Sequence, residues 1–348
     1  MPNPIENQTP VTARLTSPAQ LVSSLPVYLG FTPTDSLVVV CQHEPRGKVG
    51  LTLRFDLPRA DDEILLAQDA VRRVLHERAT RVVVAVYTDE PDGGGEHPRA
   101  GLVDELLDGL EPQLRITDAV LVRDSRFWSY LCDARCSCPP EGTPVEAARD
   151  DAQVRVIEAA RVLSGRAVLP DRAAVERSLA GPVFLAAAQA RTRLERAQEE
   201  LAAVWRTDRH QGREQLLDEW GAAVAALPSL PGDVEAARLV AALDDRLLRD
   251  HVACLDEPEV LLPLVADLCR RTPAPYDAPV ATLFAWLAYC EGGGAEVTIA
   301  LDRAQRTDPG YALAGLLRQH LDSQMPPEGL RQITQDVAVA LGLRPQPD

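Results

Sequence analysis

The chain has 348 residues, of which 46% are hydrophobic and 25% charged, a composition that excludes disorder over the whole length. Its net charge is −16, and residues 1–150 and 151–348 carry −8 each. Because nucleic-acid binding draws most of its affinity from a positively charged surface, this even acidity disfavours nucleic acid as a partner.

The length predicts two domains. Residues 1–10 contain no positively charged side chain and no apolar segment, so we expect no signal peptide. The longest apolar run, around residues 280–290, is shorter than the ~20 residues that span a bilayer. The seven cysteines, an odd number, argue against a secreted disulfide framework. These features together predict a soluble cytoplasmic protein with no membrane segment.

Residues 1–12 are expected to form a disordered leader, and a short helix follows it. Ser17 suits a helix N-cap and Pro18 suits the first helical turn, so this helix is predicted to begin there. Pro26 predicts its end, because proline has no N–H to continue the helical hydrogen bonds.

The patterns that follow are those of an α/β domain over residues 13–145. The apolar run at 36–41 predicts a strand buried on both faces, and the alternation over 49–57 predicts a strand with one buried face. A helical pattern at 61–75 precedes a second apolar run at 81–88. Strand, helix and strand in this order predict a parallel crossover.

A helix near 102–110 and a hairpin over 118–131 complete the predicted first domain, a mixed sheet of about five strands with flanking helices. The hairpin is predicted to turn at Asp124 and Ser125. Residues 132–144 contain three prolines and three cysteines and are expected to be irregular, with the domain boundary just after them.

Strand patterns stop near residue 145, and residues 146–348 are expected to form an all-helical domain. Glycines and prolines separate its helices, which are predicted at 146–163, 171–180, 183–206, 209–226, 233–254, 257–271, 279–291, 295–306, 310–323 and 327–341. The stretch from Trp286 to Leu316 resembles one tetratricopeptide unit. A solenoid needs several units, so an αα-hairpin packed in a bundle is the alternative, and the sequence favours it.

Polar residues lie where strands of the predicted sheet begin or end. Ligands of open α/β sheets bind beyond the carboxyl ends of the strands, which makes Thr88, Asp89 and His97 candidate ligand contacts. Asp35, a polar residue next to a strand, is a further candidate. The loop after residue 88 contains three consecutive glycines, but it is acidic and matches neither the dinucleotide-binding pattern nor the P-loop. A flexible surface loop is therefore the alternative.

Three cysteines, Cys132, Cys136 and Cys138, lie close together in the irregular segment. Thiolates in one short loop can hold zinc or an iron–sulfur cluster, because the loop can bend several sulfurs around one centre. No second cysteine pair follows nearby, so a fourth ligand has to come from His97, His43 or a distal cysteine. A structural loop without metal is the alternative, and the spacing favours it.

Several segments of the chain resemble a known family. They are residues 15–26, 29–31, 35–40, 128–132, 138–144 and 304–317. Together they resemble the actinobacterial family called domain of unknown function 4192. The family pattern has adjacent cysteines before the Pro-Pro-Glu-Gly segment, whereas Ser137 separates Cys136 from Cys138 here. The resemblance implies no activity, because none is established for the family.

Two hypotheses for the function follow. The sequence contains no nucleophile elbow, HExxH helix or kinase-like set of motifs. Together with the large helical half, this favours a non-catalytic scaffold or binding module that contacts another protein through its helical domain. The alternative is an enzyme or small-ligand sensor with its site at the strand ends of the α/β domain, with or without a cysteine-bound metal.

Overall fold

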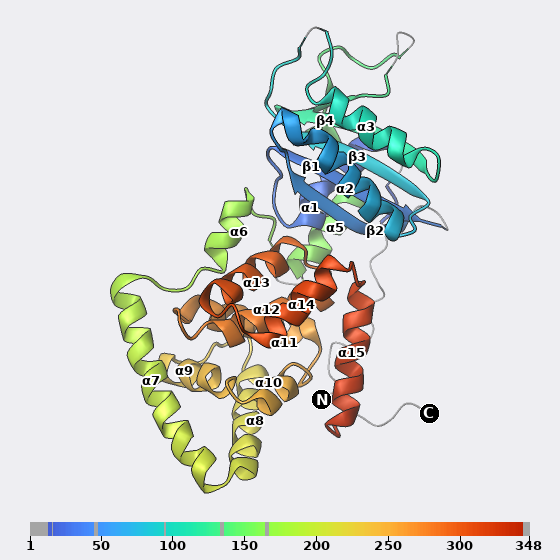
Figure 1. Cartoon of the computed structure of the whole chain (residues 1–348). Coiled ribbons are helices and arrows are strands. Elements are labelled where there is room, and N and C mark those ends of the chain that lie inside the picture. The colour runs from blue at the N-terminus through green and yellow to red at the C-terminus, as the bar shows by residue number, and fades with distance from the viewer. Residues whose placement is uncertain are drawn as a thin grey trace. The chain divides into compact units, whose positions relative to one another are not determined.

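The computed structural model describes residues 13–15, 17–44, 48–93, 95–132, 136–163 and 167–343. The leader expected at 1–12 lies outside these residues. The chain divides into two compact units, the first ending at Asp171 and the second beginning at Arg172 (Figure 1). Among the helices of the described residues, none is both long and apolar enough to cross a bilayer.

The first unit is built on a mixed six-stranded sheet with strand order β2-β1-β3-β4-β5-β6. Its strands are β1 (Ser36–His43), β2 (Lys48–Asp56), β3 (Arg81–Tyr87), β4 (Arg115–Arg123), β5 (Arg126–Ser129) and β6 (Thr143–Pro144). β3 and β4 are parallel neighbours, and the other neighbouring pairs are antiparallel. The two-residue β6 lies in the segment that the sequence predicted to be irregular.

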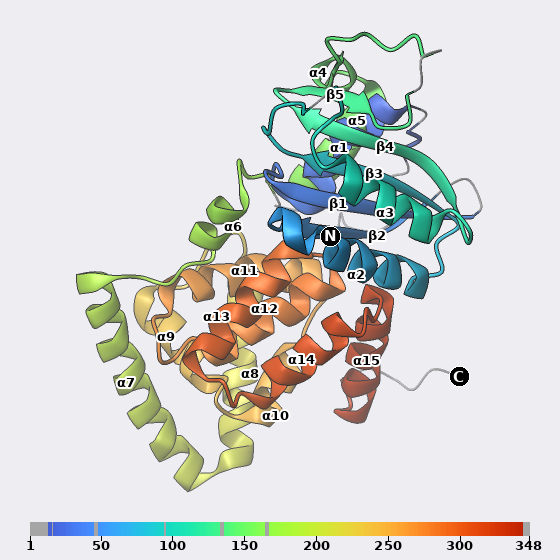
Figure 2. The same cartoon turned by 45° about the horizontal axis from the view of Figure 1, so that its top comes forward.

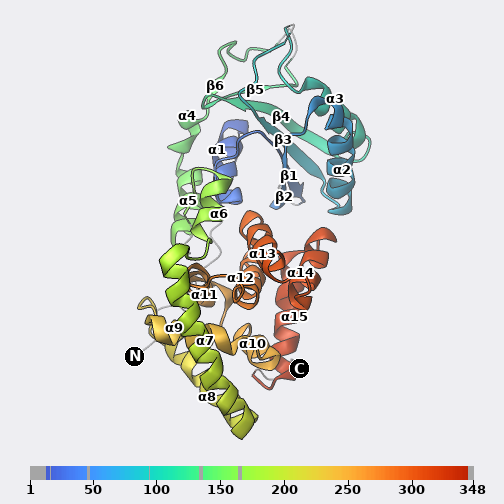
Figure 3. The same ribbon diagram turned by 60° about the vertical axis from the view of Figure 1, so that its left-hand side comes forward.

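Helices cover both faces of this sheet. They are α1 (Pro18–Leu29), α2 (Glu63–His76), α3 (Ala100–Leu110), α4 (Glu146–Arg149) and α5 (Ala152–Leu163), with a 3₁₀ turn at Ala60–Asp62. Figure 3 shows α1 and α5 on one side of the sheet and α2 and α3 on the other. Because α4 and α5 contact α1, the first unit extends beyond the boundary expected near residue 145.

Two hydrophobic layers form because the side chains of a strand alternate between the faces of a sheet. In β1, Leu37 and Val39 pack with α2 and α3, whereas Val38 and Val40 pack with α1. Residues 36–41 are all buried, which confirms the prediction of a strand buried on both faces.

The predicted end of α1 is wrong. Ser17 caps the helix as expected, with its hydroxyl accepting a hydrogen bond from the N–H of Gln20. Pro26 lies inside the helix, which continues to Leu29 and ends where Gly30 adopts a φ of 85°. Proline removes only its own helical N–H, and the residue before it, Leu25, is buried in one hydrophobic cluster with Val38 and Val40 of β1.

The prediction for β2 is wrong at one residue. Leu51 and Leu53 pack on the side of α2 and α3, as the alternation predicts, but Val49 packs on the side of α1. The reason is one extra residue in β2. The pairs Val40–Thr52 and Gln42–Val49 enclose one residue of β1 but two of β2, which moves Val49 to the opposite face.

The described part of the second unit is helical throughout. Its helices are α6 (Arg172–Ser178), α7 (Phe184–Thr207), α8 (Arg209–Ala225), α9 (Asp233–Ala242), α10 (Arg246–Val252), α11 (Pro258–Arg271), α12 (Ala278–Cys290), α13 (Ala295–Thr307), α14 (Ala312–Asp322) and α15 (Pro327–Ala340). Figure 2 shows the long α7 leading into α8. The helix predicted at 233–254 is divided, because the side chain of Asp245 caps a new helix by accepting from the N–H of Leu248.

The core of the second unit centres on α12, in which twelve of thirteen residues are buried. A helix that is apolar on all sides belongs in the interior of a domain. α13 packs against α12, and α14 contacts both helices. This is the packing of an αα-hairpin with a third helix, and by itself it does not identify a tetratricopeptide unit.

Candidate functional site

A cavity of about 260 Å³ lies in the first unit, at the end of the sheet where β1 begins and β3 ends. β1 runs antiparallel to β3 with Ser36 opposite Tyr87, so the residue before β1 and the residues after β3 meet at this end of the sheet. Asp35, Thr88 and Asp89 therefore line one cavity, which we call the strand-end cavity.

Four further segments complete the wall. They are α1, the loop that follows it, the β4–β5 hairpin and the segment that contains the short helix α4. The lining residues from these segments are Val22, Ser23 and Pro26 of α1, Thr32, Pro33 and Thr34 of the following loop, Val122 to Ser125 of the hairpin, and Val145, Glu146 and Arg149.

The inner part of the strand-end cavity is buried and carries hydroxyl groups. Tyr87, Thr88 and Ser23 are each at most 6% exposed. Within the described residues, the buried Tyr87 hydroxyl has no hydrogen-bond partner. Burial raises the pKa of Tyr87, so this hydroxyl stays protonated at neutral pH and remains a donor. A buried polar group without a partner is a group that a ligand or water can satisfy.

The mouth of the strand-end cavity is acidic. Four exposed carboxylates line it, from Asp35, Asp89, Asp124 and Glu146. Considering only the described part of the chain, none of these side chains takes part in a hydrogen bond or an ion pair. All four are therefore available to an incoming ligand.

The two arginines of the wall already have partners. Arg123 donates to the backbone oxygen of Glu90 over 2.7 Å and lies 3.2 Å from Asp92 Oδ1. Arg149 Nε lies 3.5 Å from Glu158 Oε1. Both guanidinium groups thus lie close to acids outside the cavity wall, whereas the four carboxylates of the mouth lack such partners among the described residues.

Three non-glycine residues of the wall have left-handed backbone conformations. The φ angles are 42° at Asp35, 51° at Asp124 and 59° at Ser125. The last two form the two-residue turn of the β4–β5 hairpin, where primed turns require positive φ. Such conformations are uncommon and cost on the order of 1 kcal/mol each, and they concentrate at ligand-binding sites.

His97, the fourth predicted contact, is not among the lining residues. It packs among aromatic rings, with its ring centroid 5.7 Å from Tyr130 and 6.3 Å from Trp128. Its Nδ1 lies 3.5 Å from Asp92 Oδ1. Desolvation raises the pKa of Asp92, but the hydrogen bond from Arg123 and the proximity of His97 outweigh it and hold this pKa below its usual value. His97 thus belongs to a separate polar and aromatic group.

The three cysteines of the irregular segment converge. Cys132 Sγ lies 2.8 Å from Cys136 Sγ and 3.4 Å from Cys138 Sγ, and the last two sulfurs are 2.9 Å apart. We call these three exposed thiols the thiol cluster. Hydrogen bonding with Cys136, followed by partial burial, raises the pKa of Cys132 to about 12. The thiol cluster shares no lining residue with the strand-end cavity.

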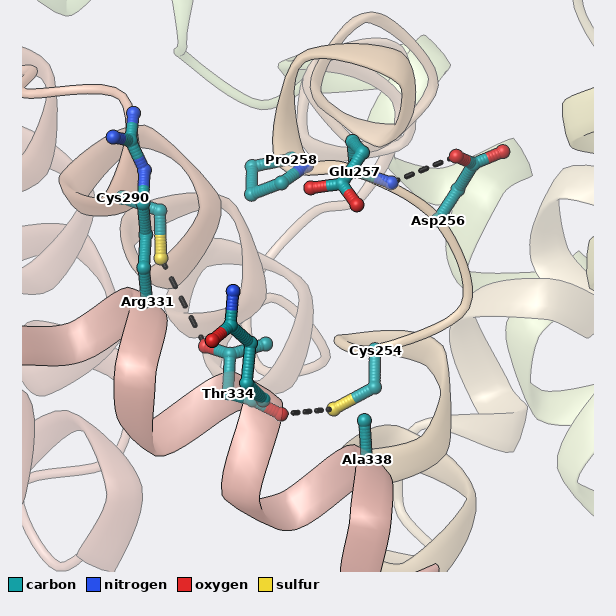
Figure 4. A pocket seen from close by; sticks show the side chains of 9 residues that line it. Cys254, Asp256, Glu257, Pro258, Cys290, Arg331, Thr334 and Ala338 are labelled. Carbon is teal, nitrogen blue, oxygen red and sulfur yellow. Dashed lines mark hydrogen bonds between the residues drawn. The ribbon is translucent and has the colours of Figure 1, made fainter. Parts of the chain in front are cut away.

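A smaller cavity of about 40 Å³ lies in the second unit (Figure 4). Cys254 Sγ donates to the backbone oxygen of Thr334 over 3.4 Å at one side of it, and Cys290 Sγ lies 3.9 Å from Thr334 Oγ1 at another. This volume suits about one water molecule, so we do not assign a ligand to it.

Several lining residues were missed by the sequence reading. Ser23 had a recognisable signal, since it is a polar residue between the apolar Val22 and Leu25 of one helix. Glu146 and Arg149 had none, because they reach the cavity only through the packing of α4 against α1.

Comparison with known proteins adds the family. The family model described as domain of unknown function (DUF4192) matches residues 18–328. No curated protein and no solved structure matches the chain. The match includes the strand-end cavity, the thiol cluster and most of the helical unit. The chain therefore belongs to the family of domain of unknown function 4192.

Proposed function

We propose that the first unit binds a small, positively charged organic molecule in the strand-end cavity and acts as a ligand-binding module. The observation that carries this proposal is that two features line one cavity. The buried Tyr87 hydroxyl and the four carboxylates of the mouth have no partners among the described residues. A ligand with a hydrogen-bonding group and an ammonium group complements both.

The charge of the mouth selects against anions. A phosphate or carboxylate entering between Asp35, Asp89 and Asp124 meets like charges and finds the two arginines already paired. An amine instead gains about 0.2–1 kcal/mol from each exposed carboxylate that it approaches. These magnitudes indicate a preference for cations that weakens with added salt.

The size of the cavity limits the ligand. Ligand pockets commonly measure roughly 300–1,000 Å³, so about 260 Å³ suits a small metabolite rather than a nucleotide or a peptide. Apolar contacts from Val22, Pro26 and Val122 are available to its hydrocarbon part.

A thermal-shift series tests the proposal. The probes are short alkyl monoamines and diamines, with alcohols and carboxylic acids of the same chain length as references. We expect the amines alone to raise the melting temperature, because only ligands that bind the folded state stabilise it. An equal response to amines, alcohols and acids contradicts the proposal.

Asp89→Asn locates the binding in the cavity. Removal of one mouth carboxylate is expected to weaken binding of the best amine by about threefold, equivalent to the loss of one exposed ion pair. Asp108→Asn is the matched control, since Asp108 is an exposed carboxylate of α3, outside the cavity lining. Equal affinities of the two variants contradict binding at the strand-end cavity.

A second candidate is that the helical unit binds another protein. The observation in its favour is a run of three exposed apolar residues at the start of α7, namely Val183, Phe184 and Leu185, which are 65%, 91% and 72% exposed. Phe184 has a φ of 50°, which is rare for an aromatic residue. Exposed aromatic side chains are enriched at sites of protein contact.

A comparison of two serine variants tests this candidate. Phe184→Ser is expected to lose partners that the wild-type chain retains from a native lysate. Leu316→Ser, at an apolar position of α14 that is 52% exposed, is expected to keep them. Retention of the same partners by both variants, or of none by the wild type, contradicts a role for this surface.

A further inference from the structure

The three sulfurs of the thiol cluster form a triangle that none of the ordinary uses of cysteine explains. The separations of 2.8, 2.9 and 3.4 Å all exceed the ~2.05 Å of a disulfide. A disulfide joins two sulfurs and leaves the third thiol without a role. Buried structural cysteines lie inside a core, whereas all three of these are exposed.

The protein frame around the cluster is held in place on its C-terminal side. Trp128 Nε1 donates to the backbone oxygen of Pro140 over 3.0 Å, and Arg126 Nη1 donates to the backbone oxygen of Gly142 over 2.7 Å. A side chain at residue 142 would lie 2.5 Å from the Trp128 ring, so the glycine backbone packs directly on the indole.

The frame is also held on its N-terminal side. The backbone N–H of Tyr130 donates to the carbonyl of Ala119 on the neighbouring β4, and its hydroxyl donates to the carbonyl of Pro98 over 2.7 Å. Cys132 follows two residues later. The segment that carries the cluster is therefore anchored to the sheet on both sides, and this lowers the entropy cost of gathering the sulfurs.

We propose that Cys132, Cys136 and Cys138 bind one thiophilic metal ion, with zinc as the ion tested and its fourth coordination position open to water or an external ligand. Thiolates bound to one tetrahedral zinc at ~2.3 Å stand ~3.8 Å apart, so the sulfurs need to separate by about 1 Å at most. Binding converts three thiols to thiolates, forms three Zn–S bonds and releases three protons to solvent.

A single ion fits this arrangement better than an iron–sulfur cluster. In a [4Fe–4S] cluster each cysteine binds a different iron, which requires the sulfurs to stand well apart, and a [2Fe–2S] cluster needs two protein ligands on each of its two irons. Here all three ligand atoms lie within 4.8 Å of one another.

The fourth position is open among the residues that the structure describes. Within them, no fourth cysteine, histidine or carboxylate joins the group of three. Three protein ligands with an open position are typical of zinc sites that bind a water or an exchangeable ligand, whereas structural zinc sites have four protein ligands.

Metal analysis of the full chain tests the proposal. The protein is purified under anaerobic, reducing conditions, incubated with zinc chloride and desalted, and its zinc is measured by elemental analysis. We expect about one equivalent. Cobalt(II) in place of zinc is expected to give sulfur-to-cobalt charge-transfer absorption, which reports thiolate coordination directly.

Two variants locate the ion. Cys138→Ser is expected to retain zinc about tenfold less well or worse, with circular dichroism showing that the protein is folded. Cys254→Ser is the matched control, since it removes a buried cysteine outside the cluster and is expected to keep one equivalent. Less than about one-tenth equivalent in the folded, reduced wild type overturns the proposal. Equal zinc in Cys138→Ser and wild type also overturns it, because the ion is then elsewhere.

Discussion

Arg303 Nε donates to Asp277 Oδ2 over 2.7 Å, and both side chains are buried. The same guanidinium group donates to the backbone oxygens of Leu179, Cys269 and Thr272. Two of these oxygens lie at the C-terminal end of α11, that of Cys269 in its last turn and that of Thr272 directly after its last residue. One side chain of α13 thus joins the segment after α6, the end of α11 and the residue that precedes α12.

The first prediction concerns this buried pair. Arg303→Met is expected to lower the free energy of unfolding by about 3–5 kcal/mol, because it leaves the Asp277 carboxylate buried without its charged donor. Chemical denaturation measures the change. Arg196→Met is the control, since Arg196 is 80% exposed in an i,i+4 pair with Glu200, and a loss within about 0.5 kcal/mol is expected. Similar losses in both variants contradict the role of Arg303.

The second prediction concerns the pH dependence of stability. Asp245 accepts two hydrogen bonds of 2.8 Å from Arg213 and one from the N–H of Leu248. Desolvation raises the pKa of Asp245, but these hydrogen bonds outweigh it and lower this pKa. A carboxyl whose pKa is lower in the folded state stabilises the fold above its unfolded pKa, and that stability is lost as pH falls through the folded pKa.

Asp245→Asn separates the charge from the helix cap, because asparagine caps a helix about as well as aspartate. At pH 7 the variant is expected to lose about 1–3 kcal/mol, the range for hydrogen bonds to charged groups. The difference from the wild type is expected to narrow below about pH 4 as Asp245 becomes protonated. Urea denaturation across this pH range measures it, and a difference that does not change with pH contradicts the assignment.

The third prediction concerns the hydroxyl in the strand-end cavity. Without ligand, Tyr87→Phe is expected to change the free energy of unfolding by less than about 1 kcal/mol, because no protein hydrogen bond is lost. Its affinity for the best amine is expected to fall by about three- to tenfold, measured by calorimetry. For Tyr289→Phe we expect the opposite result, a change in stability without a change in affinity. It loses the 2.7 Å hydrogen bond to the backbone oxygen of Met325, so stability falls by about 1 kcal/mol while affinity stays constant.

The fourth prediction concerns the turn beside the thiol cluster. Gly142 has a φ of 79°, and an added methyl group would meet the Trp128 ring. Gly142→Ala is expected to displace the indole, shift the tryptophan fluorescence and lower the free energy of unfolding by about 1–3 kcal/mol. Gly221→Ala within α8 meets open space and is expected to stabilise by up to about 1 kcal/mol. An unchanged fluorescence spectrum in Gly142→Ala argues against the packing on Trp128.

Much of the fold could be predicted from the periodicity of apolar residues, because the periods of strands and helices reflect which side chains are buried. The sequence pattern predicted β1 and β3 as buried strands, the turn at Asp124 and Ser125, and the change to helices after residue 145. The sequence pattern failed where contacts between different elements determine the local structure. Pro26 stays helical because its neighbours are buried, and Val49 changes face because β2 contains one extra residue opposite β1.

The candidate site followed only in part. The rule that ligands bind at strand ends selects Thr88 and Asp89 as candidates, and Asp35 is a candidate as a polar residue next to a strand. That the three lie together follows from the antiparallel pairing of β1 with β3, which the sequence does not reveal. The same rule assigned His97 to this group, but a loop residue can turn to either face, and aromatic packing against Tyr130 places it elsewhere. Glu146 reaches the cavity through a helix–helix contact that no local pattern records.

The outermost strand on the thiol-cluster side has a consequence for self-association. β6 pairs with β5 over only Arg126 and Phe127, and one of its two residues is Pro144, which has no N–H. A sheet edge this short, closed by a proline, gives a neighbouring molecule almost no backbone groups to pair with. Unfolding of the segment that contains β6 would uncover the longer β5, and the protein would then become prone to aggregate by edge-to-edge pairing.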